Sequence, residues 1–205
     1  IVLNYLYSMP PIRISYRGVW APLLLPLGYV LLPYLLAFYS SGSPYDGFSL
    51  MLVTGMYLCF IGRIVLKDIR DIKGDTRFGK KTFVIRHGLE NTLIFSGAFF
   101  VVGTLILSAL FLKINILLSI ALLLQMVVVV FVLEKMRTAK GRDRQQIILG
   151  VISQIATAGL LCVAVALDEN VRTGLQSFLI LAISIYGTFF GLYILYNPQF
   201  KRISY

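Results

Sequence analysis

Charge is scarce in this chain of 205 residues: Asp, Glu, Lys and Arg make up 14% of the sequence, whereas hydrophobic residues make up 58%. A soluble domain keeps a charged surface in contact with water, so this composition argues against a soluble fold. The mean hydropathy of +0.84 and the recurrent apolar runs are typical of an integral membrane protein.

Residues that bind metals through sulfur or nitrogen are also rare. Cys59 and Cys162 lie inside apolar runs, far from any metal-ligand spacing, so we interpret both as packing residues. His87 is the only histidine and has no second His or Cys near it in the sequence, which argues against a zinc site. We expect His87 to be a solvated loop residue.

Long apolar runs occur six times along the chain. A membrane-spanning helix needs about 20 mostly apolar residues, because lipid offers the backbone no hydrogen-bond partner. The predicted fold is therefore all-α, a polytopic bundle of six transmembrane helices that forms a single domain over residues 1–205. Prolines in the first span predict a kink there. The predicted spans are residues 19–39, 48–66, 92–112, 114–133, 146–167 and 174–196.

Positive charge alternates between the segments that connect these spans. One side carries only Lys113 and Arg172. By the positive-inside rule, both chain ends and the two long basic loops face the cytoplasm. Topology thus explains most of the net charge of +10, so the lipid bilayer is an expected partner and nucleic acid is not. The basic side carries Arg13, Arg17, Lys67, Arg70, Lys73, Arg77, Lys80, Lys81, Arg86, Lys135, Arg137, Lys140, Arg142, Arg144, Lys201 and Arg202.

The first basic loop contains a dense charged segment, KDIRDIKGDTRFGKKTFVIRHG, at residues 67–88. If the second span continues as a helix, Asp68, Asp71 and Asp75 fall within a sector of about 60°. Mg²⁺ would relieve their repulsion, and a loop starting near Gly74 and Gly79 would add cations for a diphosphate. A solvated membrane anchor held by i, i+4 ion pairs explains the segment equally well from the residues alone.

The segment KDIRDIKGDTRFGKKTF resembles the second aspartate-rich motif of the UbiA superfamily of intramembrane prenyltransferases. Lys67, Asp71 and Asp75 match its Lys-x-x-x-Asp-x-x-x-Asp pattern. YSMPPIR at residues 7–13 is similar to the family's connection between helices three and four, with Tyr7 and Arg13 as the tyrosine and basic residue at a wider spacing than usual. On this resemblance, residues 7–205 correspond to helices four to nine of a nine-helix fold.

The first aspartate motif of that family, of Asn-Asp-x-x-Asp-x-x-x-Asp type, has no counterpart in this sequence. Ile1 also opens the chain within an apolar run. We therefore expect the chain to be truncated at its N-terminus, without helices one to three, and to be inactive alone.

The resemblance implies a Mg²⁺-dependent transfer of a polyprenyl group from its diphosphate to an aromatic or other lipid-precursor acceptor, as in quinone biosynthesis. Asp71 and Asp75, supported by Asp68, would hold Mg²⁺. Lys67, Arg13, Tyr7 and Arg77 would bind the diphosphate, and Asp71, Asp75 and Lys67 would be the catalytic residues.

Two other functions compete with prenyl transfer as explanations of the charged segment. CDP-alcohol phosphotransferases also place aspartates at a membrane helix end, but their Asp-Gly followed by Ala-Arg is not found here. A non-catalytic membrane transporter, or a half-site relative of the family, is the main alternative. Transporters tend to keep charged residues inside the membrane, whereas these spans contain only Arg63 near an end and polar residues such as Gln125 and Gln154. We interpret both glutamines first as contacts between helices.

Overall fold

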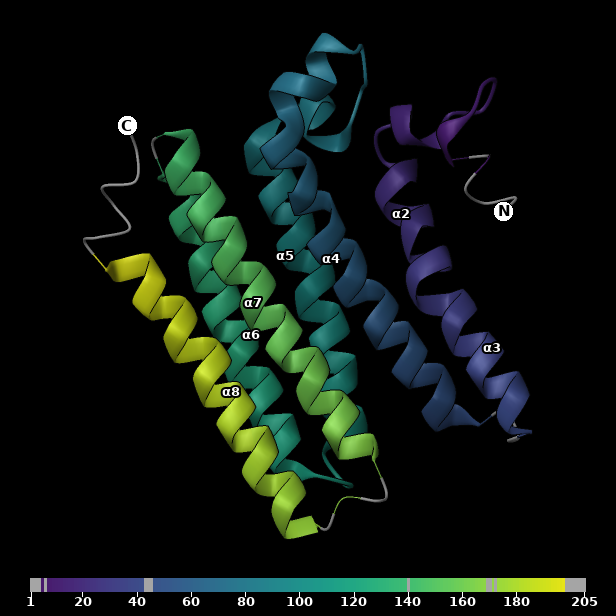
Figure 1. Cartoon of the computed structure of the whole chain (residues 1–205), viewed down its shortest axis with the longest axis vertical. Coiled ribbons are helices and arrows are strands. Elements are labelled where there is room, and N and C mark those ends of the chain that lie inside the picture. The colour runs from purple at the N-terminus through teal and green to yellow at the C-terminus, as the bar shows by residue number, and fades with distance from the viewer. Residues whose placement is uncertain are drawn as a thin grey trace. The chain divides into compact units, whose positions relative to one another are not determined.

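The computed structural model describes residues 5, 7–42, 46–139, 141–168, 171 and 173–197. Within these residues the structure is helical, and its only β-type pairing is an isolated bridge between Gly18 and Thr82. Six helical runs are long and apolar enough to cross a membrane (Figure 1), which confirms the all-α, six-span prediction. The elements in order are η1 (Ile14–Tyr16), α2 (Trp20–Pro26), η2 (Leu27–Leu31), α3 (Leu32–Ser41), α4 (Gly47–Arg77), α5 (Phe83–Phe111), α6 (Ile116–Arg137), α7 (Arg142–Leu167) and α8 (Thr173–Tyr196).

Some residues that support the predicted topology lie outside the described part of the chain. These are Ile1, Lys140, Arg172, Lys201 and Arg202. The inferred chain start at Ile1 and the charge at the other four positions therefore remain predictions from the sequence.

The first predicted span is one continuous helical run, Trp20–Ser41, built from α2, η2 and α3. Its middle element, η2, is a π-helical turn that begins directly after Pro26. Proline has no N–H to donate, and a widened turn is one way for a helix to accommodate the missing bond. The irregularity lies within the span for which the prolines predicted a kink.

The third span begins earlier than the hydropathy predicted, because α5 starts at Phe83 and not near Thr92. It includes a break in helical geometry at Gly88, whose φ of 79° lies in the region that favours glycine. His87 precedes this break inside the helix and is exposed, with its ring 4.6 Å from that of Phe83. The expectation of a loop residue was therefore wrong, although the exposure was predicted.

The chain divides into two compact units, Ile1–Gly103 and Thr104–Tyr205. In the first unit, α4 packs against α5 through glycines that allow the two backbones to approach closely. A Cβ atom on Gly62 would lie 2.7 Å from the carbonyl oxygen of Ser96, whose hydroxyl donates a 2.6 Å hydrogen bond back to the Gly62 carbonyl. Tyr57 of α4 also donates a hydrogen bond of 2.5 Å to the Leu23 carbonyl of α2.

The second unit is held together by small residues and by polar contacts between helices. Gln125 of α6 is buried and donates a hydrogen bond of 3.0 Å to the Ser184 hydroxyl of α8, which confirms its predicted role. Gly187 of α8 lies against Ala158 of α7, where an added Cβ would come within 2.4 Å of the alanine methyl. Within lipid the hydrophobic effect does not drive helices together, so packing and polar contacts of this kind stabilise their association. Cys162 is buried in this unit, as its apolar surroundings predicted.

Candidate active site

The aspartate-rich motif lies on the last turns of α4, which is longer than a membrane is thick. Its 31 residues make about 46 Å of helix, against about 30 Å of hydrocarbon. The helix starts at a side-chain cap, where Asp46 accepts a 2.8 Å hydrogen bond from the Ser49 amide. This bond lowers the pKa of Asp46. The end of α4 that bears the motif therefore extends beyond an apolar core, as we expected from the sequence.

Asp68, Asp71 and Asp75 lie along one face of this helix end. The carboxylate of Asp68 is close enough to Asp75 and Asp71 to interact with both charges. Asp71 is half exposed, and its carboxylate lies 3.6 Å from the Arg70 guanidinium. Asp75 is buried, with 8% of its surface exposed. The three carboxylates thus share a face, on which Asp71 is half exposed, Asp68 is half-buried, with its pKa raised to about 6 mainly by burial, and Asp75 is closed off.

The end of α4 explains why Asp75 is closed off. The helix passes through Gly74 and ends after Arg77, so the loop that we expected near Gly74 and Gly79 begins between these two glycines. Gly79 then takes a left-handed conformation with φ 67°. Two backbone hydrogen bonds close the turn, from Gly79 to the Thr76 carbonyl at 3.1 Å and from Lys80 to the Asp75 carbonyl at 2.9 Å. This is the Schellman arrangement, which returns the chain beside the last helical turn.

The same turn brings the side chain of Lys80 to Asp75. The Lys80 ammonium donates a hydrogen bond of 2.8 Å to Oδ1 of Asp75. This bond raises the pKa of Lys80, which therefore stays charged at neutral pH. The predicted set of site residues did not include Lys80. The signal that could have found it is a glycine at position 79, which marks a Schellman turn and pairs position 80 with position 75.

Tyr7 approaches the motif from the segment that precedes the first span. Burial raises the pKa of its hydroxyl to about 12, and the negative charge of Asp68 is the next contribution. Tyr16, from the same segment, lies close enough to Lys80 to influence its charge. The backbone bridge from Gly18 to Thr82 attaches this segment to the loop after α4. The structure thus brings together the two sequence motifs on which the predicted site depends.

The predicted basic residues are arranged less tightly around the aspartates. Arg13 is exposed, and its guanidinium lies 5.3 Å from the centroid of the Tyr16 ring. Arg77 is exposed on the last turn of α4. Lys67 is exposed as well and lies near Asp68. Within the described part of the chain, neither Arg13 nor Arg77 forms an ion pair with an aspartate. These side chains are free to reach an anion but are not held in place for one.

The carboxylates do not form a preassembled metal cage. Among the described residues, no group of three or more His, Cys, Asp or Glu side chains is arranged to hold a metal ion. The donors available at the end of α4 are carboxylate oxygens, the ligands that Mg²⁺ prefers. Mg²⁺ commonly binds proteins through one or two carboxylates and takes its other ligands from water and substrate phosphates. Asp68 and Asp71 therefore fit that ion by their chemistry, without a third protein ligand.

These features define a polytopic membrane protein with an acidic helix end beside a basic loop. Comparison with family models identifies the protein more specifically, because residues 1–149 match the model of the UbiA prenyltransferase family. The chain belongs to this family, which confirms the resemblance inferred from the two motifs. No curated protein and no solved structure matches the chain.

Proposed function

We propose that this chain takes part in the Mg²⁺-dependent transfer of a polyprenyl group from its diphosphate to an aromatic or other lipid-precursor acceptor, of the kind used in quinone biosynthesis. Membership of a prenyltransferase family supports the general reaction. The observation that carries the proposal is the shared face of Asp68 and Asp71, which lies next to Tyr7 and to exposed cations.

Asp71 and Asp68 are the residues that would hold Mg²⁺, and Asp75 would act mainly by positioning the loop through Lys80. When bound, Mg²⁺ would neutralise the charge that develops on the diphosphate as the allylic C–O bond breaks. Lys67, Arg77 and Arg13 provide exposed positive charge for the diphosphate oxygens. Tyr7 keeps its proton over a wide pH range and can donate a hydrogen bond to the same group.

The bilayer supplies the other half of the reaction. A prenyl chain dissolves in lipid and reaches a site at the end of a spanning helix without crossing water. An allylic cation is destroyed by water, so a site bordered by apolar helices favours capture by the acceptor. The proposed position of the motif and basic loops is the cytoplasmic side, where diphosphate substrates dissolve.

The proposal is tested by exchanging single carboxylates for amides in the protein as its gene encodes it. Asp71→Asn keeps the shape of the side chain but weakens its hold on a hard cation. We expect the Mg²⁺-dependent formation of prenylated lipid from a radiolabelled polyprenyl diphosphate to fall at least about 100-fold.

Asp46→Asn is the matched control, because it makes the same exchange at the opposite end of α4. Asn caps a helix about as well as Asp, so both insertion and activity should be retained. Full activity in Asp71→Asn would contradict the proposed role of the motif. Equal loss in both variants would point to damage to α4 instead.

A further inference from the structure

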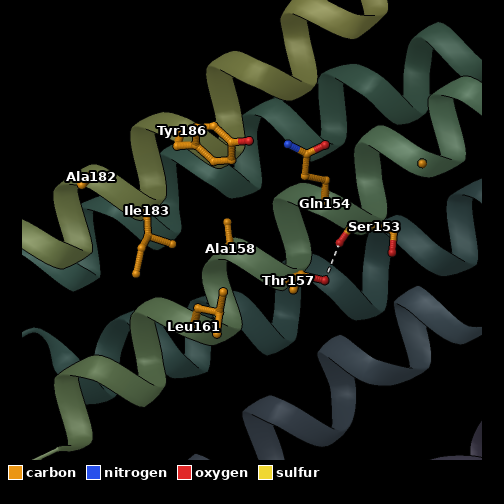
Figure 2. Close-up of a pocket in the computed structure, with 10 residues that line it drawn as sticks. Ser153, Gln154, Thr157, Ala158, Leu161, Ala182, Ile183 and Tyr186 are labelled. Atoms are coloured by element: carbon orange, nitrogen blue, oxygen red, sulfur yellow. Dashed lines mark hydrogen bonds between the residues drawn. The ribbon is translucent and has the colours of Figure 1, made fainter.

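A groove with a volume of about 670 Å³ lies between α7 and α8 in the second unit (Figure 2). Small residues from both helices line it, namely Gly150 and Ala158 of α7 and Ala182 and Gly187 of α8. Ala158 and Gly187 are in contact with each other, and the small side chains along this contact leave a groove that can hold a flat group. All of these residues follow position 149, where the match to the family ends.

Two polar side chains project into this apolar groove. Figure 2 shows Gln154 extending from α7 and the hydroxyl of Tyr186 on α8 pointing toward the side where Gln154 projects. The hydrogen bond drawn there is donated by the Thr157 hydroxyl to the backbone carbonyl of Ser153, at 2.8 Å. Among the described residues, the Gln154 carboxamide has no hydrogen-bond partner, in contrast to Gln125 in the same unit. Gln154 therefore does not form the contact between helices that we predicted for it.

The depth of these groups makes the missing partner costly. Gln154 lies near the middle of the Arg144–Leu167 span, and Tyr186 near the middle of the Thr173–Tyr196 span. Water does not hydrate polar groups at that depth in lipid, and an amide without a partner costs several kcal/mol there. A molecule that enters the groove would supply the missing hydrogen bonds.

The same depth limits the chemistry of the occupant. A charged or zwitterionic headgroup stays at the membrane surface, so an ordinary phospholipid offers Gln154 only its acyl chain. An uncharged ring that carries oxygen can lie near the midplane. It can also stack on Tyr186, whose ring is already stacked on Phe190 with the centroids 5.3 Å apart.

We propose that the groove between α7 and α8 binds an uncharged lipid with an oxygen-bearing ring, a quinone or a phenol. The ring lies in the groove along the contact of the two helices, and its oxygen is hydrogen-bonded by Gln154 and Tyr186. The carboxamide serves both ring types, since it donates to a carbonyl and accepts from a hydroxyl. This site lies wholly in the second unit and does not depend on prenyl transfer at the end of α4.

Binding is tested with two probes that share one alkyl tail. Decylbenzoquinone carries ring oxygens and decylbenzene carries none, so the pair isolates the hydrogen bonds from the burial of ring and tail. We expect the full protein in lipid nanodiscs to bind the quinone about tenfold more tightly. Gln154→Leu should remove that preference while leaving the affinity for decylbenzene unchanged.

Two further variants keep the result interpretable. Thr157→Val lies in the same groove but removes a hydroxyl already bonded to its own helix, so binding of the quinone should not change. Gly150→Leu places a side chain into open groove space and should weaken both probes, with helix content by circular dichroism as the check on folding.

Equal affinity for the two probes, or an undiminished preference in Gln154→Leu, would overturn the proposal. The proposal would also be overturned if the parent protein self-associates and binds neither probe, while Gln154→Leu is monomeric. Gln154 would then contact a second copy of the chain. None of these results depends on the Asp71→Asn assay, so the two proposals fail separately.

Discussion

Tyr7 lies where burial and a neighbouring carboxylate both oppose the loss of its proton. Burial makes the larger contribution and the charge of Asp68 the next, so the pKa rises from 10.0 to about 12. Folding therefore favours the neutral phenol. Its contribution to stability is complete below pH 10 and is lost as the pH rises toward 12.

The raised pKa of Tyr7 can be tested by titration. The phenolate absorbance of the protein, with that of Tyr7→Phe subtracted, should report Tyr7 alone among the 12 tyrosines. We expect the difference to appear only as the pH approaches 12, since the folded state retains the proton until then. Circular dichroism over the same range checks that the helices persist. A difference that develops around pH 10 would show that Tyr7 is neither buried nor close to Asp68.

The pairing of Asp75 with Lys80 shows what spacing alone misses. Helical periodicity correctly placed Asp68, Asp71 and Asp75 on one face, because that depends only on the rise and turn of α4. It did not indicate that Asp75 would be buried and bound to a lysine, because that depends on the direction of the chain after the helix ends. Gly79 sets that direction by adopting a positive φ that other residues rarely take.

The contact between α4 and α5 depends on glycine as much as on apolar side chains. Gly103 of α5 faces the turn of α4 that contains Gly55 and Cys59. A Cβ atom on Gly103 would lie 2.7 Å from the Gly55 carbonyl oxygen, and equally close to the sulfur of Cys59. The first of these atoms belongs to the backbone and cannot move aside without shifting the helix.

Gly103→Ala should therefore separate α4 from α5 and lower the stability of the first unit by about 1–3 kcal/mol, as overpacking does elsewhere. Thermal unfolding in detergent measures this as a lower midpoint. Gly28→Ala is the control, because a Cβ atom there meets no atom within 4 Å. If both variants unfold at the same midpoint as the parent protein, the close approach of α4 and α5 does not contribute to stability.

Hydropathy predicted the existence of all six spans but not how far each helix extends. The start of the first span at Trp20 is one residue from the prediction, because its charged flank and the lipid boundary coincide. Hydropathy did not predict the part of α5 before Thr92, since Arg86, His87 and Glu90 lower the hydropathy of a segment that is helical on both sides of the break at Gly88. The backbone hydrogen bonds of a helix can continue beyond the lipid into water, whereas its apolar composition ends at the lipid boundary. The sequence pattern therefore marks the part of a helix within lipid, and the site of this protein lies just beyond that part.

The two units differ in what the sequence reveals about them. The first contains both family motifs and lies wholly within the matched residues 1–149. The second contains the groove between α7 and α8, which no sequence motif marks. Its lining comes from separate helices whose alignment depends on glycine contacts, such as Gly187 against Ala158. The sequence of an apolar helix does not predict which face of the helix will line a groove.

The distribution of positive charge predicts the orientation of the chain in the membrane. Lys81 lies in the loop between α4 and α5, and Lys113 lies between α5 and α6, so α5 separates them. Both residues are exposed. The loop with Lys81 is rich in Lys and Arg, whereas the segment with Lys113 is not, which predicts that Lys81 faces the cytoplasm and Lys113 the opposite side.

Lys81→Cys and Lys113→Cys therefore form a matched pair for labelling with a maleimide that does not cross membranes. Lys113→Cys should react in intact cells, and Lys81→Cys only after the cells are made permeable. The unsubstituted protein is the background control, because Cys162 is buried and Cys59 is half-buried within α4. The reverse pattern would place the aspartate motif outside the cytoplasm. Labelling of both positions from the same side would mean that α5 does not span the membrane, which would remove the basis for positioning the motif at a membrane surface.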